Sequence, residues 1–251
     1  MIKEILARIK QGYRTMPFPF RNVKLSERYK GFPELHFSAL KKEELDELFA
    51  LCPSGCFSQN GDRAEMDLGN CLFCGLCEKK FPQAVKFSKT WSMSVSSRQD
   101  LMLSEGFKKR SVLLREDIKK LFGRSLRLRQ VSAGGCNACE ADCNVLGTPA
   151  FDMGRFGIQF VASPRHADGI LITGPVNKNM SLALKKTFDT VAHPKIVIAV
   201  GACAIGGGIY RGLPMTSGIP SEIKVDLFVP GCPPNPITIL DGLLRVIGRI
   251  K

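Results

Sequence analysis

The stretch that decides the fold is IVIAVGAC at residues 196–203, where five apolar residues lead directly to a glycine and a cysteine. A short, uninterrupted apolar run of this kind is typical of a strand buried on both faces of a parallel sheet. Comparable runs occupy 126–131, 158–161, 169–173 and 225–229, and helical patterns occupy 179–191 and 237–250. This alternation predicts an α/β fold, with a mostly parallel sheet and helices on both of its faces.

Cysteines follow three of the predicted strands. Cys136 and Cys139 come after the first strand, Cys203 comes directly after 196–200, and Cys232 follows the last strand. Ligands of such sheets gather at the carboxyl ends of the strands. One site at that edge can therefore collect all four thiolates.

A second cysteine set lies upstream, in CLFCGLCEKKFP at 71–82. Bacterial ferredoxin segments have the pattern C-x-x-C-x-x-C-x-x-x-C-P, and their fourth cysteine serves the other cluster. Here Phe81 stands at the fourth position, while Cys52-Pro53 upstream is similar to the end of a first motif. Residues 31–95 thus resemble a ferredoxin that has lost one of its two clusters. The resemblance implies one 4Fe–4S cluster held by Cys52, Cys71, Cys74 and Cys77.

Two alternatives remain open for this upstream set. Cys56 lies four residues after Cys52 and competes with it as the fourth ligand, although only Cys52 is followed by the proline of the motif. Four thiolates also suit structural zinc. The run of three evenly spaced cysteines differs from the paired cysteines of zinc knuckles, which favours iron and sulfur.

Composition bounds the class of protein. The chain has 251 residues, ten cysteines and a formal net charge of +13. No apolar stretch is long enough to span a bilayer, and the first residues lack the apolar core of a signal peptide. We therefore expect a cytoplasmic protein, in which clustered cysteines are metal ligands rather than disulfides.

The positive charge is concentrated at 107–129, which holds nine Lys and Arg against two acidic residues. One interpretation is a solvated helical face with a linker, and another is docking against an acidic partner or anionic lipid. A basic zinc protein that binds nucleic acid is a further hypothesis. No nucleic-acid signature accompanies the charge, so we expect no such partner. The glycines at 206–208 lack the Gly-Lys-Ser/Thr ending of a phosphate-binding loop.

The pattern divides the chain into four parts. We expect an N-terminal arm at 1–30 that begins as an amphipathic helix and lies on a neighbouring subunit. The ferredoxin-like part at 31–95 has a helical pattern at 41–51 and short strand-like runs at 84–87 and 91–95. A connector at 96–125 with one helix at 115–121 leads to the α/β domain at 126–251.

The last half of the chain, from about residue 122, is similar to one family. It resembles the small cluster-bearing subunit shared by complex I, where it is the 20-kDa subunit, and by membrane-bound, energy-converting NiFe hydrogenases of the formate-hydrogenlyase type. The matching stretches are GGCNACE at 134–140, RFGI at 155–158, SPRHAD at 163–168, TGPV at 173–176, GACA at 201–204 and PGCPP at 230–234. The resemblance implies a flavodoxin-like fold, a large subunit packed against the cysteine-bearing face, and a proximal 4Fe–4S cluster held by Cys136, Cys139, Cys203 and Cys232.

One detail separates the two branches of this family. The complex I subunits carry two adjacent cysteines, whereas the hydrogenase subunits carry C-x-x-C followed by glutamate, as here at 136–140. We therefore expect an oxidoreductase subunit with two 4Fe–4S clusters. It would relay electrons between a donor, either a ferredoxin or a formate-linked subunit, and a NiFe-hydrogenase-type large subunit.

The same resemblance implies a hetero-oligomer with membrane subunits. This chain would then lie peripherally on the cytoplasmic side of the inner membrane. The alternative is a complex I-like relay whose large subunit has lost nickel and iron.

Two residues beside the second cysteine set are ambiguous. Glu140 is a candidate proton carrier next to the cluster, or else a helix-start carboxylate paired with an arginine. Cys143 lies one helical turn after Cys139 and is either an inert buried thiol or a substitute ligand.

Overall fold

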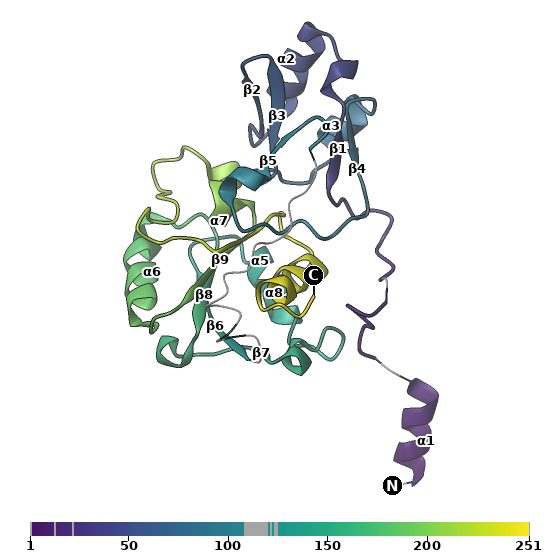
Figure 1. The fold of residues 1–251 in the computed structure, drawn as a ribbon, viewed down its shortest axis with the longest axis vertical. Helices are drawn as coiled ribbons and strands as arrows, with labels where there is room; N and C mark the ends of the chain where they lie inside the picture. The colour runs from purple at the N-terminus through teal and green to yellow at the C-terminus, as the bar shows by residue number, and fades with distance from the viewer. Residues whose placement is uncertain are drawn as a thin grey trace.

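The C-terminal half is built on a five-stranded parallel sheet with the strand order β10-β9-β8-β6-β7 (Figure 1). The computed structural model describes residues 2–12, 14–21, 23–107, 120, 122 and 125–250. The strands of this sheet are β6 (Leu126–Ser132), β7 (Ile158–Phe160), β8 (Gly169–Thr173), β9 (Ile196–Val200) and β10 (Leu227–Val229). The predicted α/β class with a parallel sheet is confirmed.

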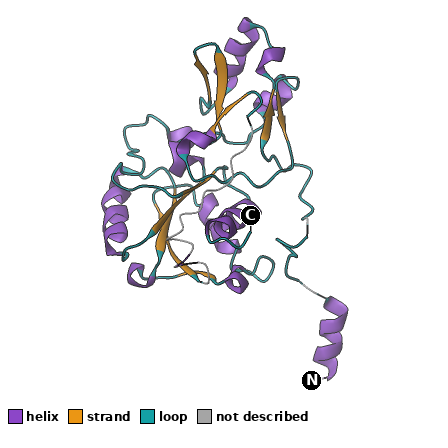
Figure 2. Ribbon diagram, in the orientation of Figure 1, coloured by secondary structure: helices purple, strands orange, loops and turns teal. Residues whose placement is uncertain are grey.

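Helices cover both faces of this sheet, as the ribbon shows (Figure 2). They are α5 (Ala138–Val145), α6 (Lys178–Thr190), α7 (Ala202–Gly206) and α8 (Pro236–Val246), with 3₁₀ turns η3 (Met153–Phe156), η4 (Pro164–His166) and η5 (Gly208–Tyr210). All five residues of β8 are buried and alternate in direction. Leu171 joins the core that includes α8, whereas Ile170 and Ile172 join Leu184 of α6 in a second core. The uninterrupted apolar runs thus follow from burial on both faces.

The N-terminal half forms two small antiparallel sheets around a core of its own. Their strands are β1 (Pro33–Leu35), β2 (Phe57–Asn60), β3 (Arg63–Asp67), β4 (Val85–Phe87) and β5 (Met102–Ser104), accompanied by α2 (Lys42–Leu51), α3 (Leu76–Lys80), η1 (Phe37–Ala39) and η2 (Arg98–Leu101). Strand β5 pairs with β3, so this sheet includes residues beyond position 95. The four-part division of the chain remains a prediction.

Several element boundaries differ from expectation. The strand predicted at 91–95 is wrong, because this segment crosses between the two halves and only Val95 forms a single bridge, to Phe228. The last strand is shorter than 225–229, and α8 ends at Val246 rather than at 250. The helix predicted at 115–121 and most of the basic stretch at 107–129 fall outside the described residues.

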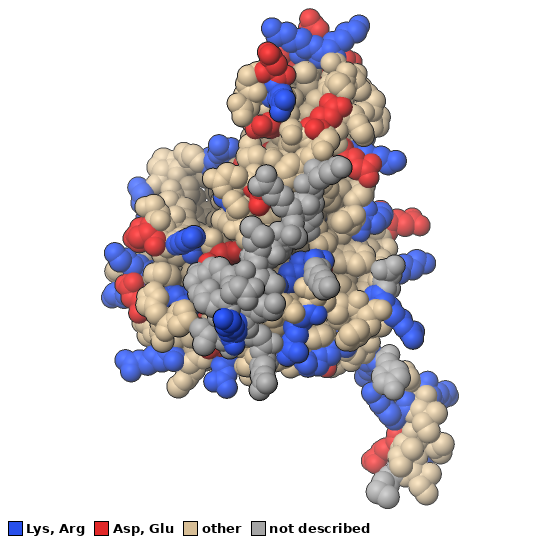
Figure 3. Space-filling model, viewed as in Figure 1, with Lys and Arg blue, Asp and Glu red and all other residues tan. Residues whose placement is uncertain are grey.

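Helix α1 (Ile2–Gln11) extends away from the rest of the molecule and buries none of its residues (Figure 1). The following segment is tied down, since the Met16 N–H donates to the Ala150 carbonyl at 2.7 Å. Lys and Arg side chains are spread over the visible face and over α1 rather than gathered in one patch (Figure 3). Of the described helices, none is both long and apolar enough to cross a membrane.

Candidate iron–sulfur sites

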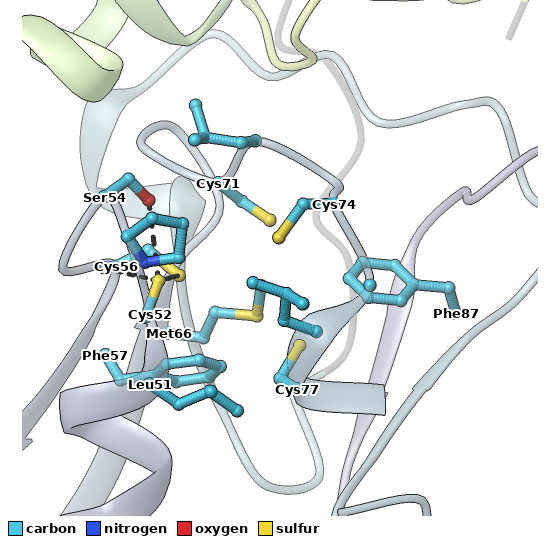
Figure 4. Close-up of a pocket in the computed structure, with 14 residues that line it drawn as sticks. Leu51, Cys52, Ser54, Cys56, Phe57, Met66, Cys71, Cys74, Cys77 and Phe87 are labelled. Carbon is cyan, nitrogen blue, oxygen red and sulfur yellow. Dashed lines mark hydrogen bonds between the residues drawn. The ribbon is translucent and has the colours of Figure 1, made fainter. Parts of the chain in front are cut away.

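The upstream cysteines converge on one cavity in the N-terminal half (Figure 4). Cys52 follows the last residue of α2, Cys71 and Cys74 lie in the loop before α3, and Cys77 lies within α3. Cys56 also lines the cavity, so the structure brings together the four predicted ligands and their competitor. The rest of the wall is mostly apolar, formed by Leu51, Phe57, Met66, Leu72, Leu76 and Phe87, among others.

The backbone around this cavity aims N–H groups at sulfur. The Phe73 N–H points at the Cys71 sulfur with a distance of 3.3 Å, and the Cys56 N–H points at the Cys52 sulfur at 3.4 Å. The loop can turn this tightly because Phe73 and Gly75 adopt positive φ angles of 53° and 76°. Glycine tolerates that conformation, whereas a residue such as Phe73 is strained in it. Hydrogen bonds of this kind to cluster sulfurs are among the factors that set a reduction potential.

Cys56 perturbs its neighbours most strongly. Its sulfur lies 3.3 Å from that of Cys52, and this contact lowers the pKa of the Cys52 thiol to about 5. The same contact, with a further one to Cys71, raises the pKa of Cys56 itself. Burial raises the pKa of Cys77 to about 12. The cavity therefore favours a thiolate at Cys52 and a protonated thiol at Cys56.

The donor set of this cavity fits a 4Fe–4S cluster. Four cysteine thiolates are the ligands that such clusters take, and an apolar wall excludes the water that competes with them. Among the described residues, no three His, Cys, Asp or Glu side chains are placed to hold a single metal ion. The fit therefore rests on the donor set and on the N–H groups directed at sulfur.

The downstream cysteines lie at the carboxyl edge of the parallel sheet. Cys136 follows β6, Cys139 is in the first turn of α5, Cys203 is in α7 directly after β9, and Cys232 lies between β10 and α8. Cys136 and Cys232 are exposed in this chain, while Cys139 and Cys203 are half-buried. Burial, followed by the charge of Cys232, raises the pKa of Cys203 to about 11, and burial followed by the charge of Cys136 raises that of Cys232. The four thiols are thus close enough to repel one another when ionised.

Glycine makes room for sulfur at this second site. Gly201 has a φ of +91°, and a Cβ built on it would lie 2.5 Å from the sulfur of Cys139. Any side chain here would occupy the space of the sulfur, so glycine alone fits. A Cβ on Gly208 would similarly lie 3.1 Å from the sulfur of Cys203. These backbone cradles and the four thiols fit a second 4Fe–4S cluster.

Glu140 is buried against the sheet, one residue after Cys139. Its Oε1 accepts hydrogen bonds from Ser132 at 2.6 Å and from Thr173 at 2.7 Å. The partners found are hydroxyl groups rather than the arginine that the sequence offered as the alternative. Its charge, after burial, raises the pKa values of Cys139 and Cys143. Cys143 is fully buried in the apolar core, which is where an inert thiol belongs.

The two cysteine sets lie next to each other. After burial and Cys136, the charges of Cys71 and Cys74 raise the pKa of Cys232. Leu72 of the upstream loop and Pro233 of the downstream loop line one cleft. Sequence reasoning missed this junction and the two residues that meet there, Asn70 and Gly206. The only sequence signal for it is their position, since each lies one to three residues from a cysteine of its set.

Comparisons with known proteins concern the downstream half. The family model described as "NADH ubiquinone oxidoreductase, 20 Kd subunit" matches residues 136–246. The chain is 42% identical over 132 residues to a protein named probable membrane-bound hydrogenase subunit mbhJ, from Pyrococcus furiosus, covering 52% of this chain and 79% of that protein.

Two further relatives represent both branches of the resemblance. Identity is 37% over 139 residues to formate hydrogenlyase subunit 7 of Escherichia coli, covering 55% of this chain and 54% of that one. It is 38% over 112 residues to an NADH-quinone oxidoreductase subunit of Desulfovibrio desulfuricans, covering 45% and 61%. Each match covers about half of the present chain, and the family model begins at Cys136.

Proposed function

Because the chain belongs to the family of the 20-kDa subunit of NADH ubiquinone oxidoreductase, whose members are subunits of oxidoreductase complexes, we propose that it is the electron-transfer subunit of a multi-subunit, energy-converting NiFe hydrogenase. Its role would be to carry electrons between a donor, a ferredoxin or a formate-linked subunit, and a NiFe-hydrogenase-type large subunit. The complex would include membrane subunits and hold this chain on the cytoplasmic side of the inner membrane.

Two 4Fe–4S clusters would supply one-electron transfer when bound. Cys52, Cys71, Cys74 and Cys77 would hold one of them, and Cys136, Cys139, Cys203 and Cys232 the other. The observation that carries the proposal is that each set converges in space and that the two sets adjoin. A chain with two adjoining redox centres has work only between other redox centres, which supports a subunit of a larger complex.

The residues around the thiols fit this role. The apolar wall of the upstream cavity keeps water from the ligands, and backbone N–H groups directed at sulfur stabilise negative charge there. Exposed Cys136 and Cys232 place the downstream site at the surface, where a large subunit could approach it. Buried Glu140 would hold or pass a proton at its carboxylate beside that surface.

The second candidate is a complex I-like relay whose large subunit lacks nickel and iron. The identity of 38% to the NADH-quinone oxidoreductase subunit of Desulfovibrio desulfuricans favours it. The C-x-x-C-Glu pattern at 136–140 and the greater identity to the hydrogenase subunit of Pyrococcus furiosus favour the first candidate.

Metal analysis and spectroscopy of the native complex, purified without oxygen, test the proposal. We expect nickel in the complex and two distinct 4Fe–4S signals in low-temperature electron paramagnetic resonance (EPR) of the reduced sample. Cys71→Ser should remove one signal and Cys232→Ser the other. Two clusters without nickel would establish the complex I-like alternative, and a colourless preparation containing zinc would refute both.

A further inference from the structure

The loop that leads to Cys71 meets helix α7 at a close contact. A Cβ built on Gly206, the last residue of α7, would lie 2.6 Å from Cγ of Asn70 and closer still to its Oδ1. The amide of Asn70 therefore lies directly against the backbone of Gly206. No residue larger than glycine fits at position 206 while Asn70 keeps this place.

The preceding residues of both segments meet in the same way. A Cβ on Gly69 would lie 2.7 Å from Cγ2 of Ile205. Ile205 packs against the core of the N-terminal half, although α7 belongs to the parallel-sheet half. Two consecutive loop residues thus contact two consecutive residues of α7, which makes this a defined interface rather than a single touch.

Asn70 is held rigidly on its own side. It is 2% exposed, and its Nδ2 donates to Oδ2 of Asp67 at 2.6 Å. Asp67 also accepts from the Gly69 N–H at 3.0 Å and from Arg98 at 2.5 Å. Oδ1 of Asn70 has no hydrogen-bond partner among the described residues. A buried acceptor without a partner is unfavourable, so tight packing against α7 rather than hydrogen bonding accounts for its position.

The contact joins the two cysteine sets by the shortest route along the chain. Asn70 directly precedes Cys71, and Gly206 lies three residues after Cys203 within one short helix. The rate of electron tunnelling falls exponentially with the distance between two redox centres. A shift at this contact would therefore change that rate without removing any ligand.

We propose that Asn70 and Gly206 are positioning residues that hold the Cys71 loop against α7 and so fix the distance between the two iron–sulfur clusters. The inference rests on the proposed function, because it requires both clusters. The step it governs is simple: one cluster loses one electron, the other gains it, and no bond forms or breaks.

A size-exchange experiment in the native complex tests the proposal. Gly206→Ala adds the methyl group that must displace Asn70. The substitution suits the backbone, because the φ of Gly206 lies outside the left-handed region and alanine is the better helix former. We expect both cluster signals to persist, their magnetic interaction in EPR to weaken, and electron transfer between them, followed by rapid freezing after reduction, to slow several-fold.

Two further variants make the result specific. Asn70→Ala combined with Gly206→Ala removes the obstructing amide, and the double variant should recover the magnetic interaction and the rate. Gly147→Ala is the matched control, because its Cβ would meet only the Asn144 carbonyl oxygen at an ordinary 3.5 Å. It should behave as the unaltered complex.

The possible outcomes separate the two proposals. Fewer than two clusters in the unaltered complex would refute the proposed function and this inference with it. Two clusters with an unchanged interaction and rate in Gly206→Ala, or no recovery in the double variant, would refute only the positioning role. If Gly206→Ala does not assemble, Asn70→Ala alone decides: it vacates the contact and should weaken the magnetic interaction, and an unchanged interaction would refute the role.

Discussion

Cys52 and Cys56 show how two residues of one type acquire different roles. Both line the upstream cavity, but Cys56 is only 2% exposed and belongs to the apolar core beneath it. The backbone N–H of Cys56 points at the Cys52 sulfur, which suits a ligand thiolate that carries negative charge. We infer that Cys52 binds the cluster and that the Cys56 thiol donates a further hydrogen bond to the Cys52 sulfur.

This assignment predicts opposite results for the two thiols. Cys52→Ala should abolish the upstream cluster, since a ligand is lost. Cys56→Ala should retain the cluster with a lower reduction potential, because a thiol donor to a ligand sulfur stabilises the more negative, reduced state. A potentiometric titration followed by EPR measures both effects. Loss of the cluster in Cys56→Ala with retention in Cys52→Ala would reverse the assignment.

Glu140 allows an equally direct test. Glutamine can accept the hydrogen bonds of Ser132 and Thr173 through its own Oε1, so Glu140→Gln should leave the fold intact while removing the ionisable proton. If Glu140 carries protons for the active site, hydrogen turnover of the assembled complex should fall by roughly 10²-fold or more. Unchanged turnover, with both clusters present, would leave Glu140 a structural carboxylate.

Helix α6 illustrates how an amphipathic element is stabilised on the sheet. Leu184 is fully buried between α6 and the strands, whereas Leu182 on the same helix is 62% exposed. The Asn177 side chain caps the helix by accepting from the Met180 N–H at 2.9 Å. Packing of the buried face, rather than helix propensity, supplies most of the stability of such a helix.

The pair of leucines gives a matched prediction for this element. Leu184→Ala should lower the free energy of unfolding by about 2–5 kcal/mol, through lost burial and the cavity left behind. Leu182→Ala makes the same chemical change at an exposed site and should alter it by no more than about 0.5 kcal/mol. Denaturant unfolding of the anaerobic protein measures the difference. Equal effects would mean that a partner or another state covers Leu182.

At the scale of the molecule, α1 is the element that the rest of the fold does not use. Its apolar residues Ile2, Ile5, Leu6 and Ile9 are between 54% and 73% exposed. An apolar face left open on a helix of this kind is typical of a surface that a partner covers. The expectation that this arm lies on a neighbouring subunit remains a prediction.

Deleting residues 1–11 tests that role. Because α1 buries no residue, the truncated chain should keep its melting temperature and both clusters. It should lose co-purification with its partner subunits, since the apolar face would no longer contribute to their contact. A truncated chain that assembles normally would exclude the arm from the interface.

Much of this molecule could be predicted from local pattern. The apolar runs at 169–173 and 196–200 indicated buried parallel strands, and the cysteines after the strands indicated a site at their carboxyl edge. These inferences succeed because burial periodicity and strand direction depend on neighbouring residues alone. The strand expected at 91–95 failed because its apolar residues bridge the two halves, and no local pattern reports that.

What sequence alone established was therefore the α/β class, the two cysteine sets and the family resemblance, because spacing along the chain carries all three. The adjacency of the two sets, the Thr173 hydroxyl beside Glu140 and the fit of Asn70 against Gly206 emerged only from the folded chain. Each of these depends on contacts between residues 33 or more positions apart in the sequence. Such contacts are set by how whole elements pack, and no spacing rule encodes them.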